Sequence, residues 1–202
     1  MLRLGLTGGI ASGKSAVAAV LREQGFHVLD ADALAHDLIE PGQPAHEELL
    51  REFGPEIAGP DGRIDRAKLA ALVFGERTRL GRLNAIVHPR VRAAIDRQFA
   101  AWEREGVRDA VFVEAALIIE AAYDEWLDGV VVAWCRPEQQ TERLLARGLS
   151  LDEAQRRIAS QMPVEEKLKH ATERIDCSGT LEETRQQVEA LAARLRKSVP
   201  HV

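Results

Sequence analysis

Short apolar runs alternate with longer amphipathic segments along this chain. Apolar residues that recur every three to four positions predict helices, and short apolar runs bounded by turn residues predict buried strands. Because strands alternate with helices, the pattern predicts an α/β fold with a parallel sheet that is covered on both faces. Strands are expected at residues 1–6, 26–30, 110–113, 129–134 and 173–176.

The stretch between the second and third strands is expected to be wholly helical. Pro89 suits the first turn of a helix, so it is expected to open the last of these helices, with His88 directly before it. A histidine at such a position serves mostly as a cap or a satisfied polar group, and a functional role is the alternative. This helical stretch is longer than an ordinary crossover connection between parallel strands and indicates an inserted lobe. Helices are expected at 33–40, 45–53, 66–74, 77–87 and 90–102.

A second helical region, residues 137–170, is rich in arginine and glutamine. Arg143 and Arg147 are four residues apart and therefore share one helix face. We interpret the region as a lid that closes over phosphates, and an ordinary exposed helix pair is the alternative. Helices are expected here at 137–146, 151–161 and 163–170, and a last helix runs from 180 to about 197.

The chemistry is indicated by the stretch that joins the first strand to the first helix. Gly8, Gly13, Lys14 and Ser15 fit the phosphate-binding pattern G-x-x-x-x-G-K-[ST]. Glycines let backbone N–H groups turn toward a phosphate chain, Lys14 reaches the β/γ-phosphates, and the Ser15 hydroxyl ligates Mg²⁺. The sequence therefore predicts a nucleoside triphosphate site. The residues expected to contact the nucleotide are Gly8, Gly9, Ala11, Ser12, Gly13, Lys14, Ser15 and Ala16.

Carboxylates follow two of the predicted strands. Asp30 and Asp32 come at the end of the second strand, at the sheet edge where α/β proteins bind ligands. One of them is also suited to cap the helix that follows. Glu114 follows the third strand, where it could act near Mg²⁺ through water. The later acidic residues Asp124, Glu125 and Asp128 are interpreted as solvated charges at a helix end.

Composition narrows the class of protein. The 202 residues have a formal net charge of −5, which disfavours a nucleic-acid partner, and 46% are apolar. The two cysteines have no metal or redox spacing, and no apolar run is long enough for a signal peptide or a membrane span. We therefore expect a cytoplasmic enzyme with no membrane partner.

A phosphate-binding loop alone leaves several functions open. The guanine-recognition motif N-K-x-D of nucleotide switches is absent from the sequence. Small size, a helical lobe and an arginine-rich lid favour a kinase that acts on a small acceptor. A nucleoside monophosphate as acceptor, or a regulatory nucleotide binder without catalysis, are the alternatives.

The sequence also resembles the dephospho-CoA kinase family over nearly its whole length. The matching segments include LTGGIASGKSAVA, VLDADALAHDLIEPGQPA, LNAIVHP and RPEQQTERLLARGLSLDEAQRRIASQMPVEEKLKHA. The resemblance implies a P-loop α/β/α sandwich of three layers around a five-stranded parallel sheet. It further implies a nucleotide-binding core of residues 1–32, 103–136 and 171–202, an acceptor lobe of residues 33–102 and a helical lid of residues 137–170.

The same resemblance implies the reaction and the roles of residues. The γ-phosphoryl of ATP would pass to the ribose 3′-hydroxyl of 3′-dephospho-CoA, with Mg²⁺ as cofactor. Asp32 would orient or deprotonate that hydroxyl, and Arg143 would stabilise charge on the phosphoryl group. Arg147, beside Arg143, would bind the nucleotide. Thr7 and His88 would lie beside the acceptor. The protein is expected to be a monomer or a weak homo-oligomer.

Four departures from the pattern of the family are present. Ala116 stands where the family usually has a proline, and Ala16 follows Ser15 where a threonine is common. Ala11 stands where glycine is usual, which is a mild change if its φ is negative. Thr172 and Cys177 stand where an acid and an amide are expected, in a loop that the resemblance puts near the adenine.

Overall fold

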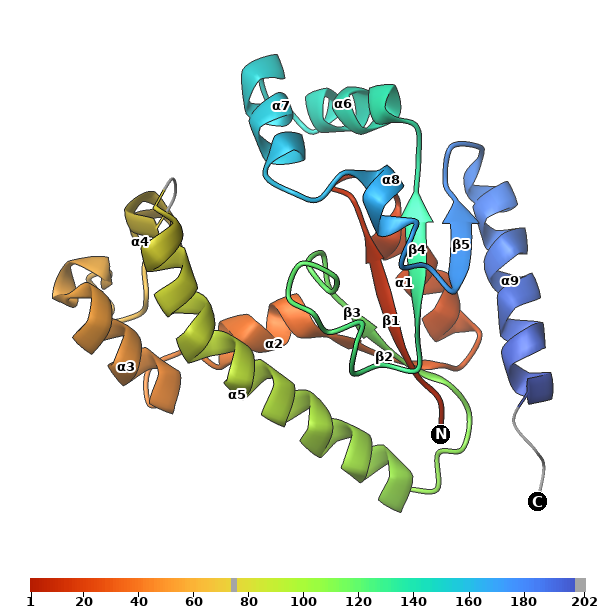
Figure 1. Cartoon of the computed structure of the whole chain (residues 1–202), viewed down its shortest axis with the longest axis horizontal. Helices are drawn as coiled ribbons and strands as arrows, with labels where there is room; N and C mark the ends of the chain where they lie inside the picture. Colours follow the sequence, from red (N-terminus) through yellow and green to blue (C-terminus); the bar gives the residue numbers. More distant parts are fainter. Residues whose placement is uncertain (74–75, 199–202) are drawn as a thin grey trace. The chain divides into compact units, whose positions relative to one another are not determined.

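A parallel β-sheet of five strands forms the centre of the computed structural model, which describes residues 1–73 and 76–198 (Figure 1). The strand order is β2-β3-β1-β4-β5, and every pairing is parallel. This confirms the predicted α/β fold class. The strands are β1 (Arg3–Gly8), β2 (His27–Asp30), β3 (Val111–Glu114), β4 (Gly129–Trp134) and β5 (Glu173–Asp176).

The register aligns the carboxyl ends of the strands along one edge of the sheet. Leu6 of β1 pairs with Glu114 at the end of β3, and Gly8 pairs with Ala133 near the end of β4. Asp30 at the end of β2 is the partner of Glu114 on its other side. The loops that leave this edge are therefore brought together, as the sequence predicts for a ligand site.

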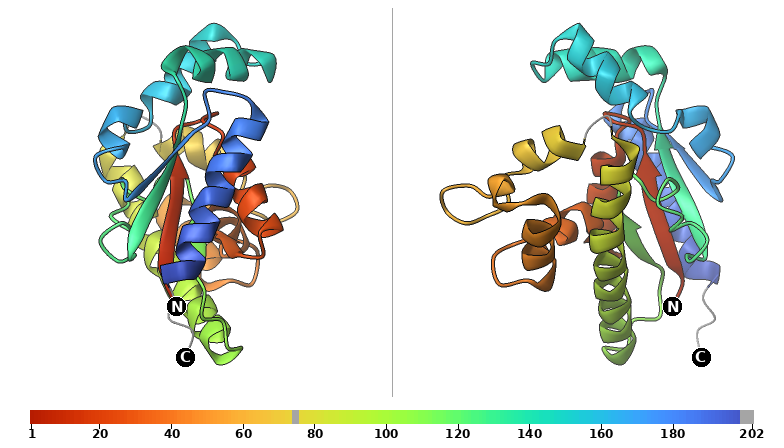
Figure 2. Two further views of the ribbon diagram at one scale, coloured as in Figure 1. Left: turned by 90° about the vertical axis from the view of Figure 1, so that its right-hand side faces the viewer. Right: turned by 60° about the vertical axis from the view of Figure 1, so that its left-hand side comes forward.

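Two helices cover one face of the sheet. These are α1 (Lys14–Glu23) and α9 (Leu181–Ser198), and both run along the strands (Figure 2). Their apolar stripes meet the sheet in one core that includes Leu21, Phe112, Val131 and Leu191. Phe26 and Phe112 add an edge-to-face ring contact with centroids 5.6 Å apart.

The segment 115–128 packs on the opposite face of the sheet without forming a helix or strand. Ile118 and Leu127 press so closely on Gly5 that a Cβ there would lie 3.0 Å from both side chains. The expected helix end at Asp124, Glu125 and Asp128 is wrong because no helix forms here, although Glu125 and Asp128 are exposed as expected. Asp128 Oδ2 accepts the Arg3 N–H at 2.7 Å, and Asp124 Oδ2 lies 2.7 Å from His170 Nδ1. Both acids therefore tie this segment to its neighbours.

The chain divides into two compact units. The first comprises Met1–Asp30 and Glu103–Val202, and the second is Ala31–Trp102. Helices α6 (Pro137–Ala146), α7 (Leu151–Ala159) and α8 (Val164–Lys167) group with the first unit. The α6 bounds agree with the prediction, whereas α7 ends earlier and the expected helix 163–170 is reduced to one turn.

The second unit is built from helices around its own small core. Leu49, Phe53 and Ile57 are buried in it together with residues of the following helix. Asp65 caps that helix as its Oδ1 accepts the N–H groups of Ala67 and Lys68. The helices are α2 (Ala31–Asp37), α3 (Pro44–Phe53), α4 (Arg66–Val73) and α5 (Arg77–Arg104), with a 3₁₀ turn at Pro55–Ile57. Phe74, the expected end of the helix at 66–74, lies outside the described residues.

The predicted break at Pro89 is wrong, because α5, which is 28 residues long, continues through it. Proline inside a helix removes one N–H and crowds the carbonyl four residues before it. The buried residues Ile86, Val91, Ile95 and Phe99 nevertheless continue at helical spacing across this point. His88 consequently lies within a helix and not in front of one. None of the helices in residues 1–73 and 76–198 combines the length and the apolar character that a membrane span requires.

Candidate active site

A cavity of about 390 Å³ opens at the carboxyl edge of the sheet, within the first unit. The phosphate-binding loop forms one wall, and Arg143 and Arg147 of the predicted lid form another. All of the loop residues expected to contact a nucleotide line it, and their contact with a nucleotide stays a prediction. The lining residues are Gly8, Gly9, Ile10, Ala11, Ser12, Gly13, Lys14, Ser15, Ala16, Ala116, Arg143, Arg147, Gln161 and Leu181.

The loop ends at Gly13, which is the N-cap of α1. Its φ is 107°, in the left-handed region that glycine tolerates and other residues avoid. A Cβ at Gly13 would also lie 2.8 Å from the Cβ of Cys177. Like any helix, α1 starts with N–H groups that have no partner within the helix, and its dipole favours an anion there. The loop geometry is therefore suited to phosphate.

Ala11 also has a left-handed backbone, with φ of 57°. The condition for a mild change, a negative φ, is therefore not met, and alanine in this conformation costs about 1 kcal/mol. The conformation is held from outside the loop. The Ala11 carbonyl accepts a hydrogen bond from Arg143 Nη1 at 3.1 Å and a weak one from the Cys135 thiol at 3.9 Å.

Lys14 pairs with the carboxylate that the sequence suggested for the metal environment. Its Nζ lies 2.9 Å from Glu114 Oε1, while Arg22 Nη2 lies 3.2 Å from Glu114 Oε2. The Glu114 side chain is only 6% exposed, and either cation provides a counter-charge for it. Lys14 lines the cavity and thus has a phosphate-facing alternative to this pair. A role for Glu114 near magnesium stays a prediction.

Ser15 carries the hydroxyl that the sequence predicts as a magnesium ligand, and this role stays a prediction. It is exposed in the first turn of α1 and lines the cavity. In the part of the chain that the structure describes, no three His, Cys, Asp or Glu side chains gather as a metal site. This donor set fits a Mg²⁺ ion that arrives with a nucleotide and keeps phosphate and water oxygens as most of its ligands.

The two arginines of α6 have different surroundings. The Arg143 guanidinium bridges the phosphate loop and the sheet, since it also donates to the Cys177 carbonyl at 2.6 Å. Arg147 is the exposed C-cap of α6. Both line the cavity. Arg143 is thus held beside the loop by hydrogen bonds, and Arg147 adds a second, exposed cation to the cavity lining.

The expected acceptor residues are outside the lining of this cavity. Thr7 is fully buried and donates its hydroxyl to the Ala116 carbonyl at 3.1 Å. Asp32 is exposed in the first turn of α2, and His88 lies inside α5, where burial lowers its pKa. Both belong to the second unit, and their roles stay predictions.

Sequence reasoning missed four lining residues. Ile10, Ala116, Gln161 and Leu181 were not predicted, although Gln161 belongs to the glutamine-rich lid segment. Leu181 is 77% exposed at the start of α9, which is unusual for a leucine. The sequence marks none of them, because their selection depends on how separate segments meet.

The two unusual positions near β5 lie at opposite ends of that strand. Thr172 precedes β5 and bonds Val130 at the start of β4, away from the edge that carries the loops. Its expected position near the adenine is therefore wrong. Cys177 follows β5 against Gly13, and burial raises the pKa of its thiol to about 11. Cys177 thus presents a neutral thiol behind the phosphate loop.

The comparison with known families decides between the small kinases. The sequence model of the family described as dephospho-CoA kinase matches residues 2–183. The chain belongs to the dephospho-CoA kinase family. The dephospho-CoA kinase of Symbiobacterium thermophilum is 50% identical over 188 residues, which cover 93% of this chain and 78% of that protein.

Solved structures agree with this assignment to the dephospho-CoA kinase family. A protein of Thermus thermophilus is 40% identical, with a TM-score of 0.83 over 96% of this chain and 97% of that one. The dephospho-CoA kinase of Campylobacter jejuni is 29% identical, with a TM-score of 0.72 over the same shares. The predicted family and the class of ATP-dependent kinase are confirmed.

Proposed function

We propose that this chain transfers the γ-phosphoryl group of ATP to the ribose 3′-hydroxyl of 3′-dephospho-CoA, which gives coenzyme A and ADP. Membership of the dephospho-CoA kinase family supports the acceptor. The observation that carries the nucleotide half is the cavity with Lys14, Ser15 and two lid arginines around one phosphate-binding loop. This is the last step of coenzyme A biosynthesis.

Charge stabilisation is the main task of the residues in the cavity. Phosphoryl transfer involves little covalent chemistry for the protein, so positioning and electrostatics supply most of the rate. Lys14 exchanges Glu114 for the β/γ-phosphates. Arg143 and Arg147 face the charge that develops on the transferring group.

A magnesium ion would be held by the Ser15 hydroxyl, with Glu114 acting through water. When bound, it neutralises phosphate charge. The exposed Ser15 hydroxyl supports this assignment, because its oxygen is a hard donor and Ser15 lies in the first turn of the helix that receives the phosphates. The Glu114 carboxylate pairs with Lys14 and adds negative potential near the metal without a direct bond to it.

The acceptor side of the reaction is assigned to the helical lobe of residues 33–102. Asp32, directly before this lobe, takes the proton of the 3′-hydroxyl or orients it, and His88 and Thr7 serve the acceptor. The exposed Asp32 carboxylate supports this role, because it is accessible to a ligand. The lid of residues 137–170 closes over the phosphates.

The expected setting is the cytoplasm, and the protein acts as a monomer or weak homo-oligomer. The two cysteines, Cys135 and Cys177, are free buried thiols, which is typical of a reducing compartment. The substrates are small molecules, and no membrane or nucleic acid takes part.

The deciding experiment measures ADP release with ATP, Mg²⁺ and 3′-dephospho-CoA, with adenosine monophosphate and a reaction without acceptor alongside. We expect turnover with 3′-dephospho-CoA alone. Turnover with adenosine monophosphate instead would overturn the acceptor assignment, and nucleotide binding without any turnover would favour a regulatory protein.

Asp32→Asn tests the base. We expect turnover to fall by about 10²–10⁴-fold, because a positioned general base contributes this much. Binding of ATP should be unchanged. Asp37→Asn, an exposed acid at the other end of the same helix, is the matched control and should keep full turnover. Equal turnover of Asp32→Asn and the wild type would remove Asp32 from the mechanism.

A further inference from the structure

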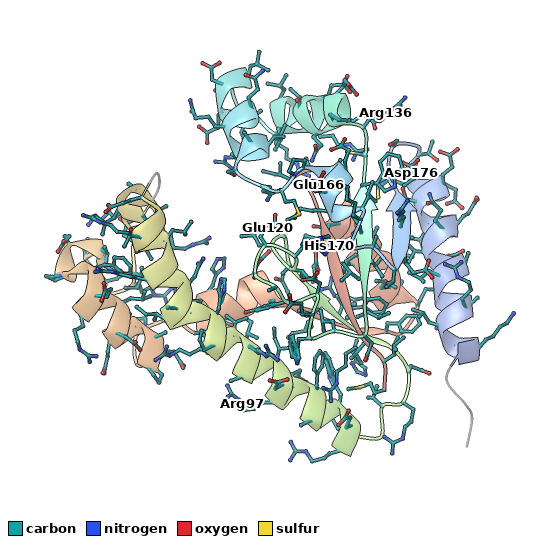
Figure 3. All side chains as sticks on the ribbon, viewed as in Figure 1. Arg97, Glu120, Arg136, Glu166, His170 and Asp176 are labelled. Carbon is teal, nitrogen blue, oxygen red and sulfur yellow. The ribbon has the colours of Figure 1, made fainter. Side chains whose placement is uncertain are left out.

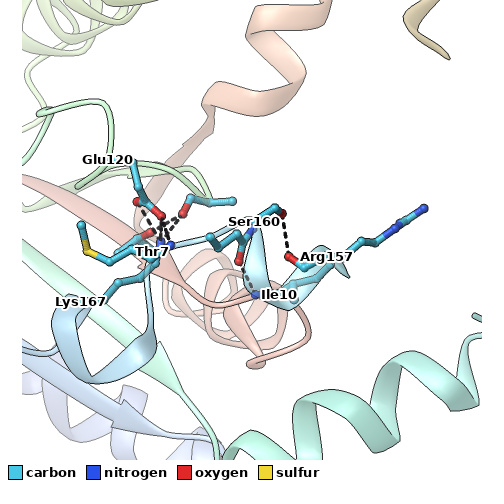
Figure 4. Close-up of polar contacts among 9 residues, drawn as sticks. Thr7, Ile10, Glu120, Arg157, Ser160 and Lys167 are labelled. Carbon is cyan, nitrogen blue, oxygen red and sulfur yellow. Dashed lines mark hydrogen bonds and ion pairs between the residues drawn. The ribbon is translucent and has the colours of Figure 1, made fainter. Parts of the chain in front are cut away.

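The peptide groups of Ile10, in the middle of the phosphate loop, are held by two glutamines. Gln161 Oε1 accepts the Ile10 N–H at 2.7 Å (Figure 4), and Gln140 Nε2 donates to the Ile10 carbonyl at 2.7 Å. Gln140 lies in α6 and Gln161 directly follows α7 and Ser160. Residues from α6 and from the end of α7 therefore meet on a single loop residue.

Gly9 provides the space for one of these bonds. A Cβ at this position would lie 2.4 Å from Gln140 Nε2, and the Gly9 backbone is outside the left-handed region. Gln140 itself is a buried side chain, only 6% exposed. Glycine at position 9 is thus explained by the approach of Gln140 and not by its own backbone conformation.

A separate set of bonds fixes the lid directly after Gln161. Glu120 Oε1 accepts the Met162 N–H at 3.0 Å, and Lys167 Nζ lies 2.8 Å from the same oxygen. Lys167 also donates to the Ala116 carbonyl at 2.7 Å. Figure 3 shows Glu120 on the segment after β3, in the same part of the first unit as Glu166 and His170 around α8. Gln161 is therefore held in place from the side of the sheet.

We propose that Gln140 and Gln161 are positioning residues that hold the phosphate loop in its binding conformation through the Ile10 peptide groups. Together they act as a clamp that joins α6 and the segment after α7 to the loop. The left-handed Ala11 follows directly, and its carbonyl is held by Arg143 of the same lid. For the kinase reaction this inference rests on the proposed function, whereas its effect on nucleotide binding does not.

The test measures the Kd of ADP by calorimetry, without acceptor, for Gln140→Met, Gln161→Met and the double variant. Methionine keeps the side-chain length and removes the hydrogen bond. We expect each single variant to weaken ADP binding about tenfold, because a lost hydrogen bond contributes roughly this factor. The double variant should resemble the single ones, because either loss already releases the peptide groups.

Gln187→Met is the matched control. Gln187 holds the peptide groups of Asp176 in the same way, accepting the N–H at 2.9 Å and donating to the carbonyl at 2.8 Å, but away from the cavity. It should lower the melting temperature and leave the Kd of ADP unchanged. An equal change of Kd in this control, or independent multiplying effects of Gln140→Met and Gln161→Met, would overturn the proposal.

Gly9→Ala gives a second route to the same result. Its methyl group would displace the flexible end of Gln140, so the Kd of ADP should rise as in Gln140→Met, and the combination of both should add nothing. An unchanged Kd in Gly9→Ala would contradict the clamp. Because ADP binding requires no acceptor, a failure of 3′-dephospho-CoA as substrate would overturn the proposed function and leave this result standing.

Discussion

Two lysine–glutamate pairs in the first unit differ in what surrounds the ammonium group. Lys14 Nζ lies 2.9 Å from Glu114, and its side chain is 17% exposed at the wall of the cavity. Lys167 Nζ lies 2.8 Å from Glu120, and its side chain is 0% exposed. The distances are nearly equal, so distance alone does not distinguish the roles of the two pairs.

The remaining partners do distinguish them. When Lys14 moves to a phosphate, Glu114 keeps Arg22 as a counter-charge. Lys167 has no such freedom, because it is also bonded to the Ala116 carbonyl and its glutamate holds the lid. Breaking a buried pair leaves an uncompensated charge, whereas a shared pair next to a cavity exchanges its partner at little cost. The first pair is suited to catalysis and the second to structure.

The largest effect is expected from Lys14→Met. Turnover should fall by about 10³-fold, since a donor to the transferring phosphate is lost. The free energy of unfolding should change by no more than about 1 kcal/mol, because Arg22 still compensates Glu114. ADP release and urea denaturation measure the two quantities. A large loss of stability with turnover retained would reverse the assigned role of this pair.

Lys167→Met should have the opposite profile. We expect the free energy of unfolding to fall by about 3 kcal/mol, because a buried ion pair loses one partner. Turnover per folded molecule should change far less than in Lys14→Met. The control is Lys169→Met, whose lysine is 67% exposed in a pair with Glu166 and should contribute about 0.5 kcal/mol or less. Similar losses of stability in both variants would contradict the comparison.

The phosphate loop could be located from sequence because its glycines and lysine satisfy a local geometric requirement. The two glutamines that hold Ile10 could not. They are 130 and 151 positions away from it, and each bond depends on how the lid packs. A motif thus indicates which backbone is suited to phosphate, and the residues that hold this backbone become visible only in the fold.

The helix across Pro89 shows a different limit of prediction from the sequence. Proline inside a helix costs about 3 kcal/mol, which justified a predicted break. Full burial of a residue such as Val91 or Ile95 contributes about 1.5–3 kcal/mol each, so the continuous buried stripe outweighs the local cost. The apolar spacing is visible in the sequence, but the sequence does not show that these residues are buried.

The buried thiols provide a probe of both lysine pairs. Cys177 lies against Gly13 of the phosphate loop, and burial raises the pKa of its thiol from 9.0 to about 11. At pH 8 the native thiol is therefore protonated and reacts slowly with iodoacetamide, so labelling proceeds through unfolding. Lys14→Met should be labelled about as slowly as the wild type, whereas Lys167→Met should be labelled faster, as it unfolds more readily.

The smallest effect is expected in the pH dependence of the free energy of unfolding. The folded state keeps the Cys177 proton up to about pH 11, while the unfolded chain releases it near 9.0, so stability is lost as pH rises through this interval. We expect a decrease of about 1 kcal/mol from pH 9 to pH 10. Cys177→Ala should remove this part of the pH dependence of the free energy of unfolding, measured by urea denaturation at each pH. An unchanged slope would mean that the thiol beside Gly13 reaches solvent in the folded state, and the wall behind the phosphate loop would then be less rigid than the contacts of Arg143 imply.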